Sequence, residues 1–218
     1  MKIYRHPKVQ AVYELHRHII LDPEFYRSVK GELTLFVDNL YQQFKAGDAR
    51  VAIEVSNYHP EYAGKPEAEI MKAPLKLEDF QLTIAKEYGF EDWADVVHHG
   101  NVAFDHDFEQ AVNYLLSGEK DHLEALVNKK TELLHQHSVY NHKAGLIHYI
   151  AANGVELWRQ VVPANLPEIT KMLLDKGADP QMAHHIYYGN GDLAALIETS
   201  AHPREAGVVE QLLALIRS

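Results

Sequence analysis

The sequence predicts an all-α fold. Apolar residues recur at spacings of three and four, as at Leu77, Phe80, Ile84 and Tyr88, and this spacing places them on one face of a helix. No stretch alternates apolar and polar residues as a half-buried strand does, so we expect short extended connections but no sheet. With 46% hydrophobic and 24% charged residues, the 218-residue chain has the composition of a globular protein.

A helical N-terminal region is expected over residues 1–104. Its first long helix has a candidate start at Asp22 and Pro23, because these residue types favour the N-cap and the first helical position. An apolar stripe then continues to Phe44, and Gly31 is a candidate for a bend or break within it.

Shorter segments follow that helix. Gly47 is expected to end it, and Asp48 to cap a short helix over residues 49–55. The next run, residues 59–74, contains several prolines and a glycine, which favour an irregular connection.

Two more helices complete the N-terminal region. The first covers residues 77–88, where Gly89 has the residue type that ends a helix in the left-handed conformation. Phe90 then supplies the apolar contact of a Schellman turn. A short helix over residues 91–99 holds Trp93.

From residue 105 onward, the helices are expected to form pairs that stack on one another. The predicted helices cover residues 107–117, 120–128, 146–153, 166–176, 192–200 and 203–217. The last one has the pattern of a capping helix, with apolar residues such as Leu212 and Leu213 facing inward and Arg204 available to solvent.

Two short motifs in this second half resemble ankyrin repeats. Residues 145–154 read GLIHYIAANG and are similar to the inner helix of such a repeat, and residues 172–180 read MLLDKGADP and are similar to the end of its outer helix. A degraded second copy begins at residues 192–202. The resemblance implies an α-solenoid of degenerate ankyrin-type helix pairs over residues 105–218, packed on the N-terminal helical region. Residues 84–93 add a likeness to bacterial ankyrin-repeat proteins of this size.

The resemblance places His148 at the motif histidine, buried and bonded to backbone. The equivalent position in the second copy is Ala195, and 195 − 148 = 47 residues, against roughly 33 for a standard repeat. Most of the excess forms an insertion at residues 155–165, whose apolar side chains predict that it is ordered. Asn165 and Glu168 have the spacing of a capping box at its end.

Charge and composition exclude several classes of protein. The balance of 21 Lys and Arg against 31 Asp and Glu gives −10, which argues against binding to nucleic acid or to an anionic membrane. No apolar run is long enough for a membrane span. Cysteine is absent, which excludes disulfides, thiolate zinc sites and cysteine nucleophiles. We therefore expect a cytoplasmic protein, a monomer, without a cofactor.

Histidines are frequent, and six of them fall in or near the expected hairpins. They are His135, His137, His142, His148, His184 and His185. Neutral imidazoles bind zinc, but the sequence contains no HExxH motif and no pair of histidines four residues apart on a predicted helix. We expect exposed hairpin histidines rather than a metal site. The acidic residues Asp105, Asp107 and Glu109 are interpreted as a charged helix start.

The candidate binding residues lie on the inner helix, in the insertion and in the hairpins. They are His142, Tyr149, Asn153, Trp158, Arg159, His185, Tyr187 and Tyr188. Tyrosine, tryptophan and arginine contribute most to binding energy at interfaces. Tyr149 follows His148 by about 100° around a helix, so it is expected to face the concave side. For Trp158, the alternative is that it packs the insertion onto the core.

Two functions remain open from the sequence. The first is a protein-binding scaffold, which recognises another protein of neutral or basic surface through the concave face. The second is an enzyme or small-molecule binder with a polar pocket between the insertion and the inner helices, lined by His142, Tyr149, Asn153 and Arg159. We favour the scaffold and expect no catalytic residues. An open groove indicates the first function, and a deep closed pocket the second.

Overall fold

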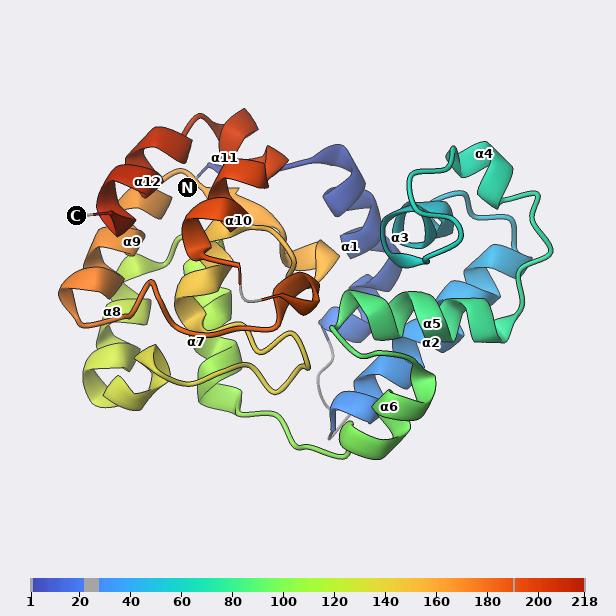
Figure 1. Cartoon of the computed structure of the whole chain (residues 1–218), viewed down its shortest axis with the longest axis horizontal. Coiled ribbons are helices and arrows are strands. Elements are labelled where there is room, and N and C mark those ends of the chain that lie inside the picture. The colour runs from blue at the N-terminus through green and yellow to red at the C-terminus, as the bar shows by residue number, and fades with distance from the viewer. Residues whose placement is uncertain (1, 22–27, 190, 218) are drawn as a thin grey trace. The chain divides into compact units, whose positions relative to one another are not determined.

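The computed structural model describes residues 2–21, 28–189 and 191–217. Within these ranges the chain is mostly helical, as the all-α prediction requires (Figure 1). The chain divides into two compact units. Residues 7–104 form one, which we call the helical unit, and residues 1–6 with 105–218 form the other, which we call the loop-rich unit.

The helical unit begins with a helix that the sequence analysis does not expect. Its helices are α1 (Pro7–Ile20), α2 (Val29–Lys45), α3 (Val51–Tyr58), α4 (Glu67–Ile70), α5 (Leu77–Glu87) and α6 (Trp93–His99). Proline favours the first turn, where no N–H is needed, and α1 starts at Pro7. Val9, Val12, Leu15 and Ile19 bury one face of α1 at helical spacing.

Local signals set most helix ends in this unit. Ser28 caps α2 by accepting from the Gly31 amide at 3.2 Å, and α2 continues past Gly31 without a break. The expected start at Asp22 and Pro23 lies outside the described residues. The Schellman turn after α5 is confirmed, because Gly89 has φ 82° and the Phe90 amide donates to the Ala85 carbonyl at 2.8 Å.

The loop-rich unit alternates helices with irregular segments. Its helices are α7 (His106–Ser117), α8 (Lys120–Lys129), α9 (Leu166–Asp175), α10 (Leu193–Thr199), α11 (Ala201–Ala206) and α12 (Val209–Ile216). Its short 3₁₀ helices are η2 (Thr131–Leu134), η3 (Leu146–Ala151), η4 (Leu157–Arg159) and η5 (Ile186–Tyr188). The helix expected over residues 203–217 is two helices, because Gly207 adopts φ 74° and ends α11.

A two-stranded sheet in this unit corrects the expectation of no sheet. Strand β1 (Ile3–Arg5) pairs antiparallel with β2 (Val161–Pro163), and Tyr4 lies opposite Val162. Three-residue strands are too short for an alternating pattern to be recognised. The pairing also joins residues 158 positions apart, Tyr4 and Val162, so the sequence contains no local signal for it.

The segment that resembles an ankyrin inner helix also differs from expectation. Residues 146–151 form the 3₁₀ helix η3, and all six of its side chains are buried. It ends at Ala152, which has φ 46°. A helix buried on every side has no exposed face, so the amphipathic pattern that the sequence analysis assumes does not apply here.

The insertion at residues 155–165 packs into the unit. Val155, Leu157, Val161 and Val162 are buried, in agreement with the expectation for its apolar side chains. The capping box predicted at its end is wrong. Asn165 does precede α9, but its side-chain amide donates to the Gly118 carbonyl at 2.9 Å instead of capping the helix.

Any side chain at position 154 is predicted to destabilise the loop-rich unit. A Cβ at this position would lie 2.0 Å from Ile186 Cγ2, and φ is +68°. Gly177 also has a left-handed φ, +96°, but nothing lies within 4 Å of its Cβ position, so it is the matched control. We expect Gly177→Ala to cost about 1–2 kcal/mol from the backbone alone. Gly154→Ala adds overpacking of about 1–3 kcal/mol, measured by urea unfolding. Equal losses in the two variants would contradict this.

Candidate functional site

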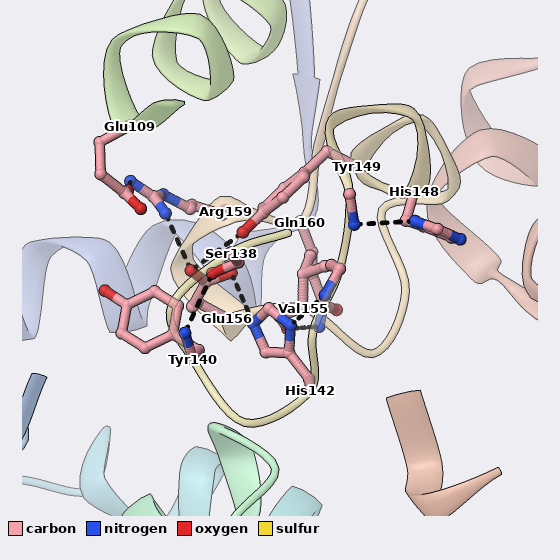
Figure 2. A network of polar contacts seen from close by, with 12 residues as sticks. Glu109, Ser138, Tyr140, His142, His148, Tyr149, Val155, Glu156, Arg159 and Gln160 are labelled. Carbon is pink, nitrogen blue, oxygen red and sulfur yellow. Dashed lines mark hydrogen bonds and ion pairs between the residues drawn. The ribbon is translucent and has the colours of Figure 1, made fainter. Parts of the chain in front are cut away.

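A network of polar side chains lies in the loop-rich unit, and all of them are buried except Glu109, which is half-buried (Figure 2). Its members, which we call the polar network, are Glu109, His142, Tyr149, Glu156 and Arg159. They come from α7, from the loop before η3, from η3 itself, and from η4 with the residue before it. The network therefore connects segments that have little regular backbone structure of their own.

Arg159 joins two carboxylates. Its Nη1 donates to Glu156 Oε1 at 2.8 Å, and its Nη2 donates to Glu109 Oε2 at 2.6 Å. Such short, charge-assisted bonds are the strong class of hydrogen bond. The guanidinium also lies 4.5 Å from the ring centre of Trp158, which gives it a cation–π contact.

The pKa values of the two carboxyl groups shift in opposite directions. Burial disfavours ionisation of Glu156, but the Arg159 charge and His142 outweigh it and lower the pKa of Glu156 to about 2. Glu109 has its pKa raised, because burial outweighs the attraction of Arg159. Arg159 itself stays charged, because the two acids raise its pKa against the effect of burial. At neutral pH, Glu156 and Arg159 are a fully buried ion pair.

His142 and Tyr149 complete the surroundings of Glu156. His142 Nδ1 accepts from the Ala144 amide at 3.0 Å, so in the neutral ring the proton is on Nε2, which faces Glu156 Oε2 at 3.7 Å. The Tyr149 hydroxyl donates to Glu156 Oε1 at 3.4 Å. Burial, and then the Glu156 charge, raise the pKa of Tyr149 well above its usual value, so the hydroxyl stays protonated.

His148 stabilises the neighbouring loops. Its Nδ1 accepts from the Gly145 amide at 2.9 Å, and its Nε2 donates to the Met182 carbonyl at 3.1 Å. Burial lowers its pKa to about 4, so the ring is neutral at pH 7. This confirms the expectation of a buried histidine bonded to backbone.

Three of the predicted binding residues have come together in the interior. His142, Tyr149 and Arg159 are buried around Glu156, and Tyr149 is 0% exposed. The prediction that Tyr149 faces an open concave side is therefore wrong, because η3 is enclosed on all sides. Trp158 is half-buried against Arg159.

Two of the other predicted residues, His185 and Tyr187, are exposed, and Asn153 is half-buried. Tyr187 is 62% exposed, and its hydroxyl donates to Asn153 Oδ1 at 2.6 Å. The Asn153 amide in turn donates to the Leu196 carbonyl at 2.9 Å. His185 is exposed, and its backbone amide donates to the His142 carbonyl at 2.7 Å. The side chain of Tyr188 lies outside what the structure describes.

The histidines divide into two groups. His135, His137 and His185 are exposed as expected, whereas His142, His148 and His184 are buried. The expectation of exposed hairpin histidines is therefore wrong for His142 and His184, whose rings accept backbone amides inside the loops, whereas His148 is buried as expected. In the described part of the chain, no three His, Asp or Glu side chains are grouped so that they could hold a metal ion.

Two members of the polar network, Glu156 and Glu109, are not among the binding residues predicted from the sequence. The interpretation of Asp105, Asp107 and Glu109 as a charged helix start is confirmed, because Asp105 caps α7 and the other two lie in its first turn. Glu109 has the additional bond to Arg159. Glu156 and Arg159 are three residues apart, a spacing that suits an ion pair on one turn, and this signal was available in the sequence. The contact between Glu109 and Arg159 spans 50 positions and has no local signal.

Strained backbone occurs at three positions of the loop-rich unit. Among the described residues, three that are not glycine have positive φ: Lys143 at 50°, Ala152 at 46° and Tyr187 at 53°. Lys143 follows His142, Ala152 ends η3, and Tyr187 bonds to Asn153. Left-handed backbone costs such residues about 1–2 kcal/mol each and persists only where the surroundings enforce it.

Comparison with protein-family models, with curated proteins and with solved structures finds no match. Across residues 2–21, 28–189 and 191–217, no helix has both the length and the apolar character needed to cross a bilayer.

Removing the Arg159 charge is predicted to destabilise the loop-rich unit severely. Arg159→Met leaves Glu156 and Glu109 buried without their cation, which costs about 3–5 kcal/mol in urea unfolding. Arg217 is the control, because its 2.6 Å pair with Glu198 is exposed, and Arg217→Met should cost less than about 1 kcal/mol.

Arg159→Met should also change how the stability of the protein depends on pH. In Arg159→Met, Glu156 and Glu109 have lost their cation. Protonation removes the repulsion between them and the cost of burying their charges, so the variant should recover part of its lost stability as the pH falls from 7 to 5. If the two arginine variants lost similar amounts and showed no such recovery, the network would not be the main support of these loops.

Proposed function

We propose that the chain is a protein-binding module whose contact surface is formed by Asn153, His185 and Tyr187, which we call the exposed edge. The observation that carries the proposal is the state of Tyr187. It exposes a large aromatic ring while occupying a strained left-handed conformation. Packing does not account for an exposed ring, and strained residues cluster at functional sites.

The exposed edge is held rigidly, which favours recognition. The Tyr187 hydroxyl bond to Asn153 fixes the ring, and Asn153 is anchored to the Leu196 carbonyl of α10. A ring ordered before binding loses little entropy when a partner covers it. Tyrosine offers apolar area together with a hydroxyl, a combination enriched at protein interfaces.

The exposed edge is connected to the polar network by a backbone hydrogen bond. The backbone of His185 is bonded to the backbone of His142, whose ring faces Glu156 in the network. The ankyrin-like motifs support the same assignment, since such repeats bind partners on their hairpin side. The net charge of −10 favours a partner of neutral or basic surface.

Enzymatic activity in the polar network has less support. His142, Glu156 and Arg159 are each at most 4% exposed. Their polar groups point at one another, so a substrate would have to separate a buried ion pair to reach them. This arrangement suits a support for loops better than an acid–base centre.

Tyr187→Gly should separate stability from binding. Glycine adopts left-handed backbone freely, so relief of strain offsets the loss of the Asn153 bond, and unfolding should change by less than about 1 kcal/mol. Partner binding should fall at least tenfold in quantitative affinity capture, because an anchoring aromatic is lost. Tyr114→Ala, on α7 of the same unit, is the control and should retain the partner.

A photo-crosslinking amino acid at position 187 tests contact directly. It should attach covalently to the partner that the wild-type protein captures, and the same amino acid at position 114 should not. If Tyr187→Gly captures the same proteins in the same amounts as wild type, the exposed edge is not the binding surface.

A further inference from the structure

Histidine rings hold the backbone segment that leads into η5. We call residues 182–186 the tethered segment. His148 Nε2 donates to the Met182 carbonyl of this segment at 3.1 Å, and His137 Nε2 donates to the Ala183 carbonyl at 2.8 Å. A carbonyl oxygen only accepts, so each of these rings must carry a proton on Nε2.

Two rings at this place also accept a backbone amide on Nδ1. His148 Nδ1 accepts from the Gly145 amide, in the loop before η3, at 2.9 Å. His184 Nδ1 accepts from the amide of Ile186, the first residue of η5, at 3.1 Å. A backbone amide only donates, so both Nδ1 atoms must be free of a proton. The two loops therefore depend on neutral imidazole rings.

The His148 and His184 rings, which we call the histidine pair, are in contact in the interior. Their centres lie 4.7 Å apart in an edge-to-face arrangement, and each residue is at most 1% exposed. A positive charge on either ring would lie away from water, where burial disfavours it. Charges on both rings would also repel each other at short range.

The ionisable groups that face the histidine pair would not compensate such a charge, because they are histidines as well. His137 faces His148, and His142 and His185 face His184. Of these, only His142 has a carboxylate of its own in reach, since its Nε2 lies 3.7 Å from Glu156.

The acids of the elements packed on η3 are either paired elsewhere or exposed. Helices α7, α9 and α10 and the short helix η2 pack on η3. The paired acids are Asp107 with Lys130, Glu109 with Arg159, Asp175 with Lys171 and Glu198 with Arg217. Glu132 of η2 and Glu168 of α9 are exposed. A charge on the histidine pair would therefore be opposed by burial without a nearby counter-charge.

We propose that the histidine pair is an acid-sensitive switch: its neutral rings hold the tethered segment in place, and their protonation in mildly acidic solution releases this segment together with η5. A proton on Nδ1 turns the acceptor of the Gly145 or Ile186 amide into a second donor, so the hydrogen bond is lost. Tyr187 lies in η5 and has a strained backbone that persists only where the surroundings enforce it. The switch would thus disorder the exposed edge in acid, and as a control of partner binding it rests on the proposed function.

The pKa directions agree with this geometry. Burial lowers the pKa of His148 to about 4 and also lowers the pKa of His184. In an opened loop a histidine titrates near its ordinary value of 6.5, so the open state binds protons more tightly. The closed state is therefore fully stabilised above pH 6.5 and loses this stabilisation as the pH falls toward 4. For His148 alone, the equilibrium constant for closing should fall about twentyfold between pH 7 and 5.

Hydrogen exchange of single amides, followed by NMR on the full chain, tests the switch locally. Global unfolding is less specific, because burial also lowers the pKa of His16 in the helical unit to about 4. After correction for the intrinsic exchange rate, the protection of the Gly145 and Ile186 amides should fall at least tenfold between pH 7 and pH 5.

The matched variant combines His148→Gln with His184→Asn. Glutamine at the third position of a helix accepts from the N-cap amide, as His148 does from Gly145. Asparagine accepts the amide two residues further on, as His184 does from Ile186. Neither side chain titrates, so protection of both amides should stay within about threefold between pH 7 and 5. His135→Asn, at an exposed position of the same unit, should keep the wild-type decline.

The histidine ring signals of the wild-type protein give a readout that does not depend on the folding of the double variant. The rings of His148 and His184, assigned through the two single variants, should remain protonated on Nε2 alone at pH 6, and their protonation at lower pH should accompany the loss of amide protection. Ring signals that titrate near pH 6.5 would overturn the proposal. So would amide protection that is flat from pH 7 to 5, or a decline that the double variant leaves unchanged. None of these measurements uses a partner, so they are separate from the test of the proposed function by Tyr187→Gly at pH 7.

Discussion

The bond between Arg159 and its two carboxylates is the constraint on which the loop-rich unit depends. Arg159 is buried and joins Glu109 of α7 to Glu156 beside η4. Placing these charges out of water is costly, so each must keep its partner. Because the partners sit on different segments, the path of the chain between them is fixed by the requirement that the ion pairs form.

This constraint explains why strained backbone survives here. Regular helices satisfy their own amides, but here the backbone amides of Ala144 and Gly145 donate to the rings of His142 and His148. In the segment around residues 152–160, the Gln160 side-chain amide donates to the Val155 carbonyl. Such bonds define unusual turns and hold Lys143 and Ala152 in left-handed conformations. The loops are therefore rigid in spite of their irregular path, and a rigid loop can present an exposed side chain such as Tyr187 in one orientation.

The sequence predicted features that depend on neighbouring residues. The helical class, the Schellman turn at Gly89 and Phe90, and the buried, backbone-bonded state of His148 are all read from local patterns, and the structure has them. The β1–β2 pairing and the Glu109–Arg159 bond join distant segments, and a single sequence carries no local signal for either. The sequence also did not predict that Tyr149 is buried, for a related reason. The amphipathic rule assumes a helix with one exposed face, and tertiary packing removes that face from η3.

The two units bury acidic side chains in two different ways. In the loop-rich unit, the Arg159 charge accompanies Glu156, and the pKa of Glu156 is lowered to about 2. That arrangement does not change near neutral pH. In the helical unit, Glu54 is buried with His16 Nε2 at 2.9 Å from its Oε2, and burial raises the pKa of Glu54 to about 8. A proton can leave when the pH rises and a covalently attached guanidinium cannot, so the two units should respond differently to alkaline solution although both bury carboxyl groups.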